Sequence, residues 1–184
     1  MVTTGRHRPV FHHRYREKGL YLMSTAAQQQ VQVAMYTMCL VQDGDKVLLI
    51  NRPNRLGFPG YIGPGGKVDF PESLTEGAAR EVFEETGLRV KDLVYKGLDE
   101  FVDPKKNFRY MVFNYLARSY EGELLQNPPE GELLWVKIDE ALNLPMQDWF
   151  KRRFPLFFEE GTFEIHEVWD QDEQKSYRSS FTKH

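Results

Sequence analysis

The 184-residue chain has a single cysteine, Cys39, and no uninterrupted apolar segment long enough to cross a bilayer. One cysteine cannot form an intrachain disulfide or a cysteine-based zinc site. A membrane-spanning helix needs about 20 consecutive apolar residues. These absences exclude a disulfide scaffold and a transmembrane protein, and they favour a reducing, cytoplasmic location. With 41% apolar and 14% aromatic residues, the chain still has the side chains for a packed core.

Acidic residues outnumber basic residues outside the first 30 positions. Residues 1–30 carry five basic side chains and one acidic side chain, a net charge of +4, so the remainder carries −7 of the total of −3. General nucleic-acid binding needs a basic face, and we therefore expect no stable nucleic-acid partner. A nucleotide substrate stays compatible with an acidic body, because a bound metal ion can invert the local field.

The apolar pattern predicts one folded domain that begins at residue 31. Residues 1–30 lack a sustained apolar period, and we expect a disordered, basic N-terminal extension there, followed by a domain over 31–184. Strands are predicted at 31–41, 46–51, 109–117 and 133–138, with a closing hairpin at 162–169 and 176–181. Helices are predicted at 71–86 and 148–158. Strands that alternate with two helices predict an α/β or α+β sandwich.

Three glutamates of the first predicted helix share one face. Glu81, Glu84 and Glu85 are spaced i, i+3 and i+4. At about 6 Å and an effective dielectric near 20, each pair of carboxylates repels by roughly 3 kcal/mol. One interpretation is a solvated acidic helix face. The other is a cation site, because Mg²⁺ and Mn²⁺ prefer all-oxygen ligands of this kind.

The surroundings of the helix favour the cation site. A segment dense in glycine and proline, residues 53–66, precedes the helix and lets backbone approach a ligand closely. Glu72 stands at the beginning of the helix, and Arg80 directly precedes Glu81. A glycine-rich loop, an acidic helix and an arginine together suit a metal-bound polyphosphate.

The stretch GKVDFPESLTEGAAREVFEETGL, residues 66–88, resembles a complete Nudix box. Its fixed positions are all filled, by Gly66, Glu72, Arg80, Glu81, Glu84, Glu85 and Gly87, with apolar Val82 and Leu88. The flanking strands and the final helix extend the resemblance over roughly 31–181. The resemblance implies a mixed β-sheet sandwiched between helices, and a hydrolase that cuts a nucleoside diphosphate linked to another moiety.

The resemblance also implies a cofactor and roles for individual residues. Mg²⁺ or Mn²⁺ is the implied cofactor, and the implied metal ligands are Glu81, Glu84, Glu85, Glu130 and the backbone carbonyl of Gly65. Glu132 is the alternative to Glu130. The implied catalytic residues are Glu81, Arg80 and Glu84. Of these, Glu81 orients or deprotonates the attacking water, and Arg80 holds a box carboxylate in place.

Substrate contacts are expected from the loop and from nearby aromatic side chains. Gly66 supplies a tight turn, and Lys67 follows the glycines at a place where it can meet a phosphate. Phe58, Tyr61 and Trp149 are expected to stack on a base, with packing in the core as the alternative interpretation for each ring.

The segment from Asn143 to Phe181 resembles the MutT-like group, which converts oxidised purine nucleotides such as 8-oxo-dGTP to the monophosphate and pyrophosphate. One branch of that group reads the base with polar side chains at positions that here hold Ile62, Trp149 and Phe150. This departure leaves the base preference open. Hydrolysis of (p)ppGpp, of a dinucleoside polyphosphate or of an RNA 5′ end is the alternative activity. A non-catalytic ligand-sensing domain is the alternative of another class, and a homodimer stays open.

Overall fold

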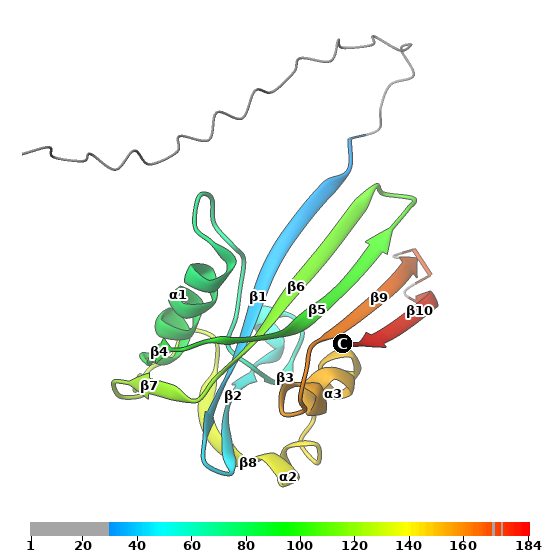
Figure 1. Cartoon of the computed structure of the whole chain (residues 1–184). Helices are drawn as coiled ribbons and strands as arrows, with labels where there is room; N and C mark the ends of the chain where they lie inside the picture. The colour runs from blue at the N-terminus through cyan, green and yellow to red at the C-terminus, as the bar shows by residue number, and fades with distance from the viewer. Residues whose placement is uncertain (1–29, 171, 174) are drawn as a thin grey trace, which may run out of the picture.

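The computed structural model describes residues 30–170, 172–173 and 175–184. The predicted N-terminal extension lies outside these residues, apart from Gln30. The elements are β1 Gln32–Asp43, β2 Lys46–Arg52, η1 Asn54–Leu56, β3 Gly60–Ile62, α1 Leu74–Thr86, β4 Arg89–Lys91, β5 Val94–Asp103, β6 Phe108–Ala117, β7 Ser119–Glu121, β8 Glu132–Lys137, α2 Ile138–Ala141, α3 Asp148–Arg153, η2 Phe154–Phe157, β9 Phe163–Asp170 and β10 Lys175–Lys183 (Figure 1).

One mixed sheet organises the domain. Its strand order is β10-β9-β5-β6-β1-β2-β3, and β8 pairs with β2. Strands β1 and β6 run parallel, as do β5 and β9, whereas the other pairs in this sheet are antiparallel. Strands β4 and β7 form a separate two-stranded sheet. The predicted mixed sheet with helices is confirmed.

Each face of the sheet packs against different helices. Along β1, Cys39 and Val41 belong to the hydrophobic cluster that contains Ala78 and Val82 of α1. Met38 and Leu40 alternate with them and belong to the cluster that contains the aromatic residues of α3 and η2. Figure 1 shows α1 and α3 on opposite sides of the sheet. This arrangement brings the end of α1 close to the glycine-rich segment that follows β3.

Both predicted helices are shorter than expected. Ser73 is the N-cap of α1, so the residues from Pro71 to Ser73 precede the helix rather than open it. The predicted continuous helix over 148–158 is wrong: α3 ends at Arg153 and a 3₁₀ turn, η2, follows. Pro155 has no amide hydrogen and its ring clashes with the carbonyl four residues earlier, so the α-helix cannot continue through it.

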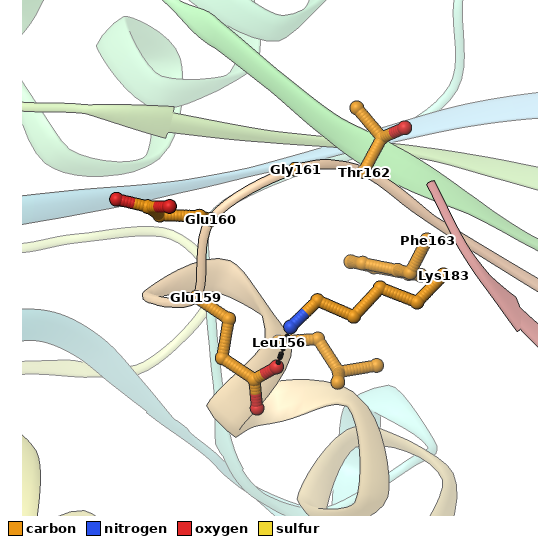
Figure 2. A pocket seen from close by; sticks show the side chains of 7 residues that line it. All are labelled: Leu156, Glu159, Glu160, Gly161, Thr162, Phe163 and Lys183. Atoms are coloured by element: carbon orange, nitrogen blue, oxygen red, sulfur yellow. Dashed lines mark hydrogen bonds and ion pairs between the residues drawn. The ribbon is translucent and has the colours of Figure 1, made fainter.

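The closing hairpin, β9 and β10, is confirmed and is tied to the segment that follows η2. Lys183 of β10 pairs with Glu159 at 2.6 Å beside a shallow depression of the surface (Figure 2). Lys96 of β5 donates to the carbonyls of Glu159 and Gly161, at 2.5 and 3.1 Å. None of the helices in the described part of the chain is long and apolar enough to cross a membrane.

Candidate active site

Helix α1 is fixed at both ends by its own sequence. The Ser73 hydroxyl accepts from the Glu76 amide at 3.2 Å, and the Glu76 carboxylate accepts from the Ser73 amide at 2.8 Å, which is a capping box. Gly87 ends the helix with a φ of 84°, where a side chain would be strained. Ala78 and Val82 are buried against the sheet. These contacts fix the direction in which the glutamates project.

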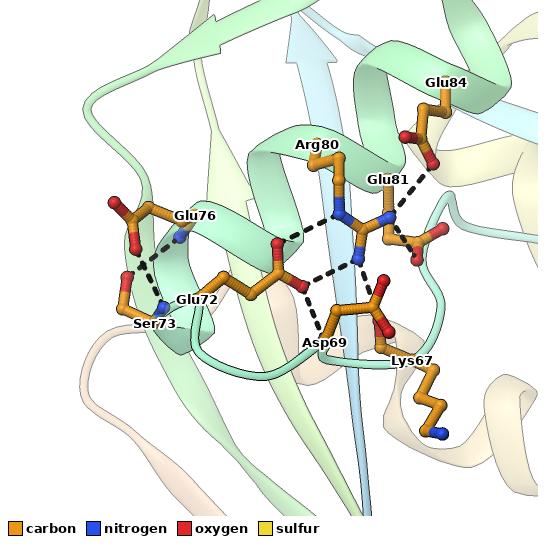
Figure 3. A network of polar contacts seen from close by, with 8 residues as sticks. All are labelled: Lys67, Asp69, Glu72, Ser73, Glu76, Arg80, Glu81 and Glu84. Carbon is orange, nitrogen blue, oxygen red and sulfur yellow. Dashed lines mark hydrogen bonds and ion pairs between the residues drawn. The ribbon is translucent and has the colours of Figure 1, made fainter.

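Arg80 lies at the centre of a network of carboxylates (Figure 3). Its Nε and Nη2 donate to the two oxygens of Glu72, at 3.0 and 2.7 Å. Its Nη1 donates to Glu81 at 2.8 Å and to Glu84 at 3.0 Å. Its Nη2 also donates to the Lys67 carbonyl at 2.9 Å. One guanidinium therefore serves three carboxylates, and the cluster keeps an excess of negative charge.

The charges of this network are reflected in the pKa values of its acids. The hydrogen bonds from Arg80, helped by the Asp69 amide, lower the pKa of Glu72 to about 2. Burial raises the pKa of Glu81, although the Arg80 guanidinium opposes this effect. For Glu81, therefore, burial raises the pKa by more than the nearby Arg80 guanidinium lowers it.

Glu85 adds a further carboxylate beside this network. It accepts a hydrogen bond from the Gly65 amide at 2.9 Å. Burial raises the pKa of Glu85 to about 8, and the carboxylates of Glu81 and Glu130 act in the same direction. The Arg52 guanidinium opposes them only in part. The structure therefore brings Glu81, Glu85 and Glu130 within electrostatic reach of one another, with too little positive charge to balance them.

The glycine-rich loop lies directly against the first of these acids. A Cβ at Gly66 would overlap the Glu81 carboxylate, and a Cβ at Gly65 would overlap the backbone of Thr37 in β1. Within residues 30–170 the carbonyls of Pro64 and Gly66 accept hydrogen bonds from β1, whereas no hydrogen bond reaches the carbonyl of Gly65. That carbonyl is therefore available to a ligand.

Arg52 is a residue of this region that the sequence analysis missed. It ends β2, and its Nη2 lies 3.1 Å from the Glu130 carboxylate and 3.2 Å from the Leu56 carbonyl. Its Nε is buried without a hydrogen-bond partner in the described part of the chain. An arginine at the end of an apolar strand, just before a glycine-rich loop, is the signal that could have identified it. Glu132, the alternative to Glu130, is an exposed residue at the start of β8.

The carboxylates lie near one another but do not form a preorganised set of metal ligands. Among the described residues, no three His, Cys, Asp or Glu side chains already surround a common point as ligands. The acids instead accept hydrogen bonds from Arg80, Arg52 and the Gly65 amide. An all-oxygen donor set with excess negative charge is the chemistry that hard divalent cations prefer. The residues present therefore fit such a cation once their side chains reorient.

The remaining predicted substrate residues lie in different surroundings. Phe58 is 65% exposed, at a backbone φ of 46°. Tyr61 and Trp149 are partly buried against the cluster on the α3 side of the sheet. The Lys67 side chain points away from the Arg80 network in Figure 3, and only its carbonyl contacts Arg80. None of these four side chains makes a polar contact with the α1 carboxylates in the described part of the chain.

The NUDIX domain family matches residues 32–157, and the chain therefore belongs to the Nudix hydrolase family. The MutT protein from Bacillus halodurans superposes with a TM-score of 0.70 at 34% identity, covering 80% of this chain and 97% of that one. The oxidized purine nucleoside triphosphate hydrolase of Mus musculus is 32% identical over 152 residues, which are 78% of this chain and 92% of that protein.

A third relative is more similar over a shorter stretch. YtkD of Bacillus subtilis (strain 168), named as a candidate 8-oxo-dGTP diphosphatase, is 52% identical over 100 residues, which are 54% of this chain and 61% of that protein. The chain spans less than half the length, 39% and 43%, of two NAD-capped RNA hydrolases NudC that it also matches. Nudix hydrolases act on nucleotide substrates and generally use divalent metals.

Proposed function

We propose that the chain is a divalent-metal-dependent nucleoside triphosphate pyrophosphohydrolase whose substrate is 8-oxo-dGTP or a related oxidised purine nucleotide. The products are the nucleoside monophosphate and pyrophosphate. The observation that carries the proposal is the charge imbalance at α1, where Arg80 alone serves Glu72, Glu81 and Glu84 while Glu85 lies beside them. The relatives named for oxidised purine substrates support the choice of nucleotide.

Glu81, Glu84, Glu85, Glu130 and the Gly65 carbonyl are the residues that we assign to the cation, which is Mg²⁺ or Mn²⁺. When bound, a divalent cation neutralises phosphate charge and lowers the pKa of a coordinated water. Three of these side chains project from α1, and Gly65 and Glu130 approach from loops. The proposal requires Glu130 to leave Arg52 and Glu84 to leave Arg80, and both pairs lie near the surface, where an ion pair contributes little to stability.

Glu81 is the residue that we assign to the attacking water. Its carboxylate faces the backbone of Gly66 so closely that a Cβ at this position would displace it. Burial raises its pKa, and a carboxylate with a raised pKa is a better proton acceptor once ionised. Arg80 holds this carboxylate at 2.8 Å and is a positioning residue in the proposal.

Arg52 provides the positive charge nearest to Glu130 on the side of β2. Its Nε is buried without a partner in the described residues, and a buried unpaired donor is costly. We assign this donor to a phosphate oxygen of the substrate, because an anion at that place would satisfy the group.

A panel of nucleotides with the products resolved tests the proposal. Chelator-treated protein is incubated with Mg²⁺ or Mn²⁺ and with 8-oxo-dGTP, dGTP, dATP, (p)ppGpp, a dinucleoside polyphosphate and a capped RNA. We expect 8-oxo-dGTP to have the highest kcat/KM and to give pyrophosphate. Preferred cleavage of another substrate would contradict the substrate assignment, and release of orthophosphate would contradict the assigned products. If none of these nucleotides were hydrolysed, the proposed pyrophosphohydrolase activity would be contradicted.

A further inference from the structure

Aromatic rings from three neighbouring strands line the α3 side of the sheet. Tyr36 of β1 stacks on Tyr110 of β6 with ring centroids 4.6 Å apart, and Tyr110 stacks on Phe101 of β5 at 4.8 Å. All three rings are only partly buried. Together they form an aromatic row, in which Tyr36 and Tyr110 pack against the hydrophobic cluster that contains the α3 residues. A planar ligand could stack on such a row.

A buried ion pair lies beside this aromatic row. Arg153 of α3 is fully buried, and its Nη1 donates to Oδ2 of Asp99 in β5 at 2.7 Å. Its guanidinium carbon lies 4.7 Å from the centre of the Trp149 ring. Asp99 is directly opposite Val112 in β6, and Phe101 is opposite Tyr110 two residue pairs along the same two strands. The ion pair of Arg153 and Asp99 therefore lies on the same face of the sheet as the aromatic row.

Asp99 has an unused hydrogen-bonding atom. Oδ2 accepts from Arg153, whereas no side chain or backbone group among the described residues donates to Oδ1. The Asp99 side chain is 12% exposed. The Arg153 Nε is also buried and without a partner in the same part of the chain. The ion pair thus contains one buried donor without a partner, the Arg153 Nε, and one carboxylate oxygen, the Asp99 Oδ1, that is free to accept from a ligand.

Stability does not explain why the ion pair is there. Replacing a buried ion pair with apolar side chains of similar volume is often neutral or stabilising. The Arg153 guanidinium contacts the sulfur of Met38 and lies over the rings of Trp149 and Phe150, so its surroundings are largely apolar. A carboxylate held in place by a buried guanidinium is instead well suited to reading the donors of a ligand.

The aromatic row and the carboxylate site of α1 are linked by the glycine-rich loop and by Arg52. Burial raises the pKa values of both Glu85 and Tyr110, and the charge of the Arg52 guanidinium opposes this rise slightly at each of them, so Arg52 lies within electrostatic reach of both sites. Ile62 and Tyr61 of β3 pack against the same hydrophobic cluster as Tyr36 and lead directly into the glycine-rich loop. A nucleotide with its phosphates at α1 would therefore have its base directed toward the row.

We propose, resting on the function proposed above, that Asp99 recognises a guanine-type base through hydrogen bonds to Oδ1 while the base lies against Tyr36 and Tyr110. Arg153 is the positioning residue that holds Asp99 in place. A carboxylate is an acceptor only, and guanine presents two adjacent donors on its Watson–Crick edge, the N1–H and the 2-amino group. 8-Oxoguanine keeps both donors. Adenine presents an acceptor at N1, which a carboxylate repels.

The substitution Asp99→Asn tests this proposal, with Glu167→Gln as its matched control. Glu167 of β9 is also a carboxylate paired with an arginine of α3, at 2.6 Å from Arg152. We expect Asp99→Asn to lower kcat/KM for 8-oxo-dGTP and dGTP by about 10- to 100-fold, and to change that for dATP by less than about threefold. Glu167→Gln should leave the ratio between the bases unchanged. A folded Asp99→Asn variant with the wild-type ratio would overturn the proposal.

A modified substrate tests the same contact in the unaltered protein. N1-methyl-dGTP lacks the N1–H donor, and we expect wild-type kcat/KM to fall by at least about 10-fold relative to dGTP. Equal use of the two nucleotides would overturn the proposal even if Asp99→Asn did not fold.

Equilibrium binding separates this proposal from the proposed function. Calorimetric titration with 8-oxo-dGMP and dAMP measures base preference without hydrolysis. Preferential, Asp99-dependent binding of 8-oxo-dGMP by a protein that hydrolyses no triphosphate would contradict the function and support the recognition site. Hydrolysis of triphosphates together with equal binding of the two monophosphates would contradict the recognition site alone.

Discussion

The two arginines Arg80 and Arg153 occupy very different charge environments. Arg80 is about a quarter exposed and contacts Glu72, Glu81 and Glu84. Arg153 is fully buried and contacts a single carboxylate, that of Asp99. The first cluster has more acid than base, whereas the second is balanced one to one.

This difference in charge balance separates a site for a cation from a site for a neutral group. Carboxylates in excess of their arginine repel one another and gain from a divalent cation. A balanced, desolvated pair gains nothing from a further charge, but it can offer a fixed hydrogen-bond acceptor. We therefore expect substitutions in the Arg80 cluster to affect turnover, and substitutions of Arg153 to affect stability and base preference.

The largest effect is expected from the double substitution Glu84→Gln with Glu85→Gln. Amides are poor ligands for hard divalent cations, so turnover of the best substrate should fall by at least about 10³-fold. Steady-state kinetics at saturating Mg²⁺ measure the loss. Glu76→Gln is the control, because it lies on the same helix and a glutamine maintains the capping box. A double variant with wild-type turnover would refute the assignment of these acids.

The next largest effect is expected on stability, from Arg153→Met. The substitution leaves the Asp99 carboxylate desolvated and unpaired, which should cost about 3–5 kcal/mol of unfolding free energy. Urea denaturation followed by tryptophan fluorescence measures the change. Arg152→Met, which removes a more exposed partner of Glu167, should cost less than about 1 kcal/mol. Equal losses from the two variants would contradict the contrast between a buried and a surface pair.

A smaller effect is expected from Gly66→Ala. The new methyl group would overlap the Glu81 carboxylate, which must then move away from its present position. Since the obstacle is the end of a flexible side chain, we expect turnover to fall by about 10- to 100-fold with only a small change in melting temperature. Gly44→Ala, in the turn between β1 and β2, serves as the comparison for turnover: its Cβ would meet nothing within 4 Å, and its φ of 58° strains an alanine, which lowers stability without touching the acids. Similar turnover losses in both variants would contradict the claim that the contact between Gly66 and the Glu81 carboxylate is needed for turnover.

The smallest effect concerns Cys39, which belongs to neither cluster. Its thiol is fully buried, and burial raises its pKa to about 12, so almost no thiolate exists at pH 8. We expect no measurable reaction of the native protein with a thiol reagent at pH 8, and one reactive thiol per chain in denaturant. Rapid labelling of native protein would show that the α1 side of the core opens readily.

The sequence predicted the carboxylate site better than the aromatic row. The helix, its acids and Gly87 form a local pattern in which spacing alone places the side chains on one face. The strand β5 was not predicted, because Lys96, Asp99, Glu100 and Asp103 interrupt its apolar pattern. Lys96, Asp99 and Glu100 are met by partners distant in the sequence, whereas Asp103 accepts from the nearby amides of Lys105 and Lys106.

The same reason explains why Asp99, Arg153 and Arg52 were not identified as candidates. A lone aspartate in a strand and an arginine in a short helix carry no spacing signal, and Asp99 lies 54 residues from its partner Arg153. The early end of α3 was also missed, although Pro155 marks it. Contacts within one helix follow from the sequence, whereas contacts across the sheet require the fold.

Direct measurement of cation binding tests the central claim, that the acidic end of α1 holds a divalent metal ion. Chelator-treated protein is titrated with Mn²⁺, and the free ion is followed by electron paramagnetic resonance, for the wild type and for the Glu84→Gln, Glu85→Gln double variant. We expect saturable binding by the wild type, at least about tenfold weaker binding by the variant, and no turnover until metal is restored. Equal binding by the two proteins, or full turnover after removal of metal by the chelator, would contradict the account.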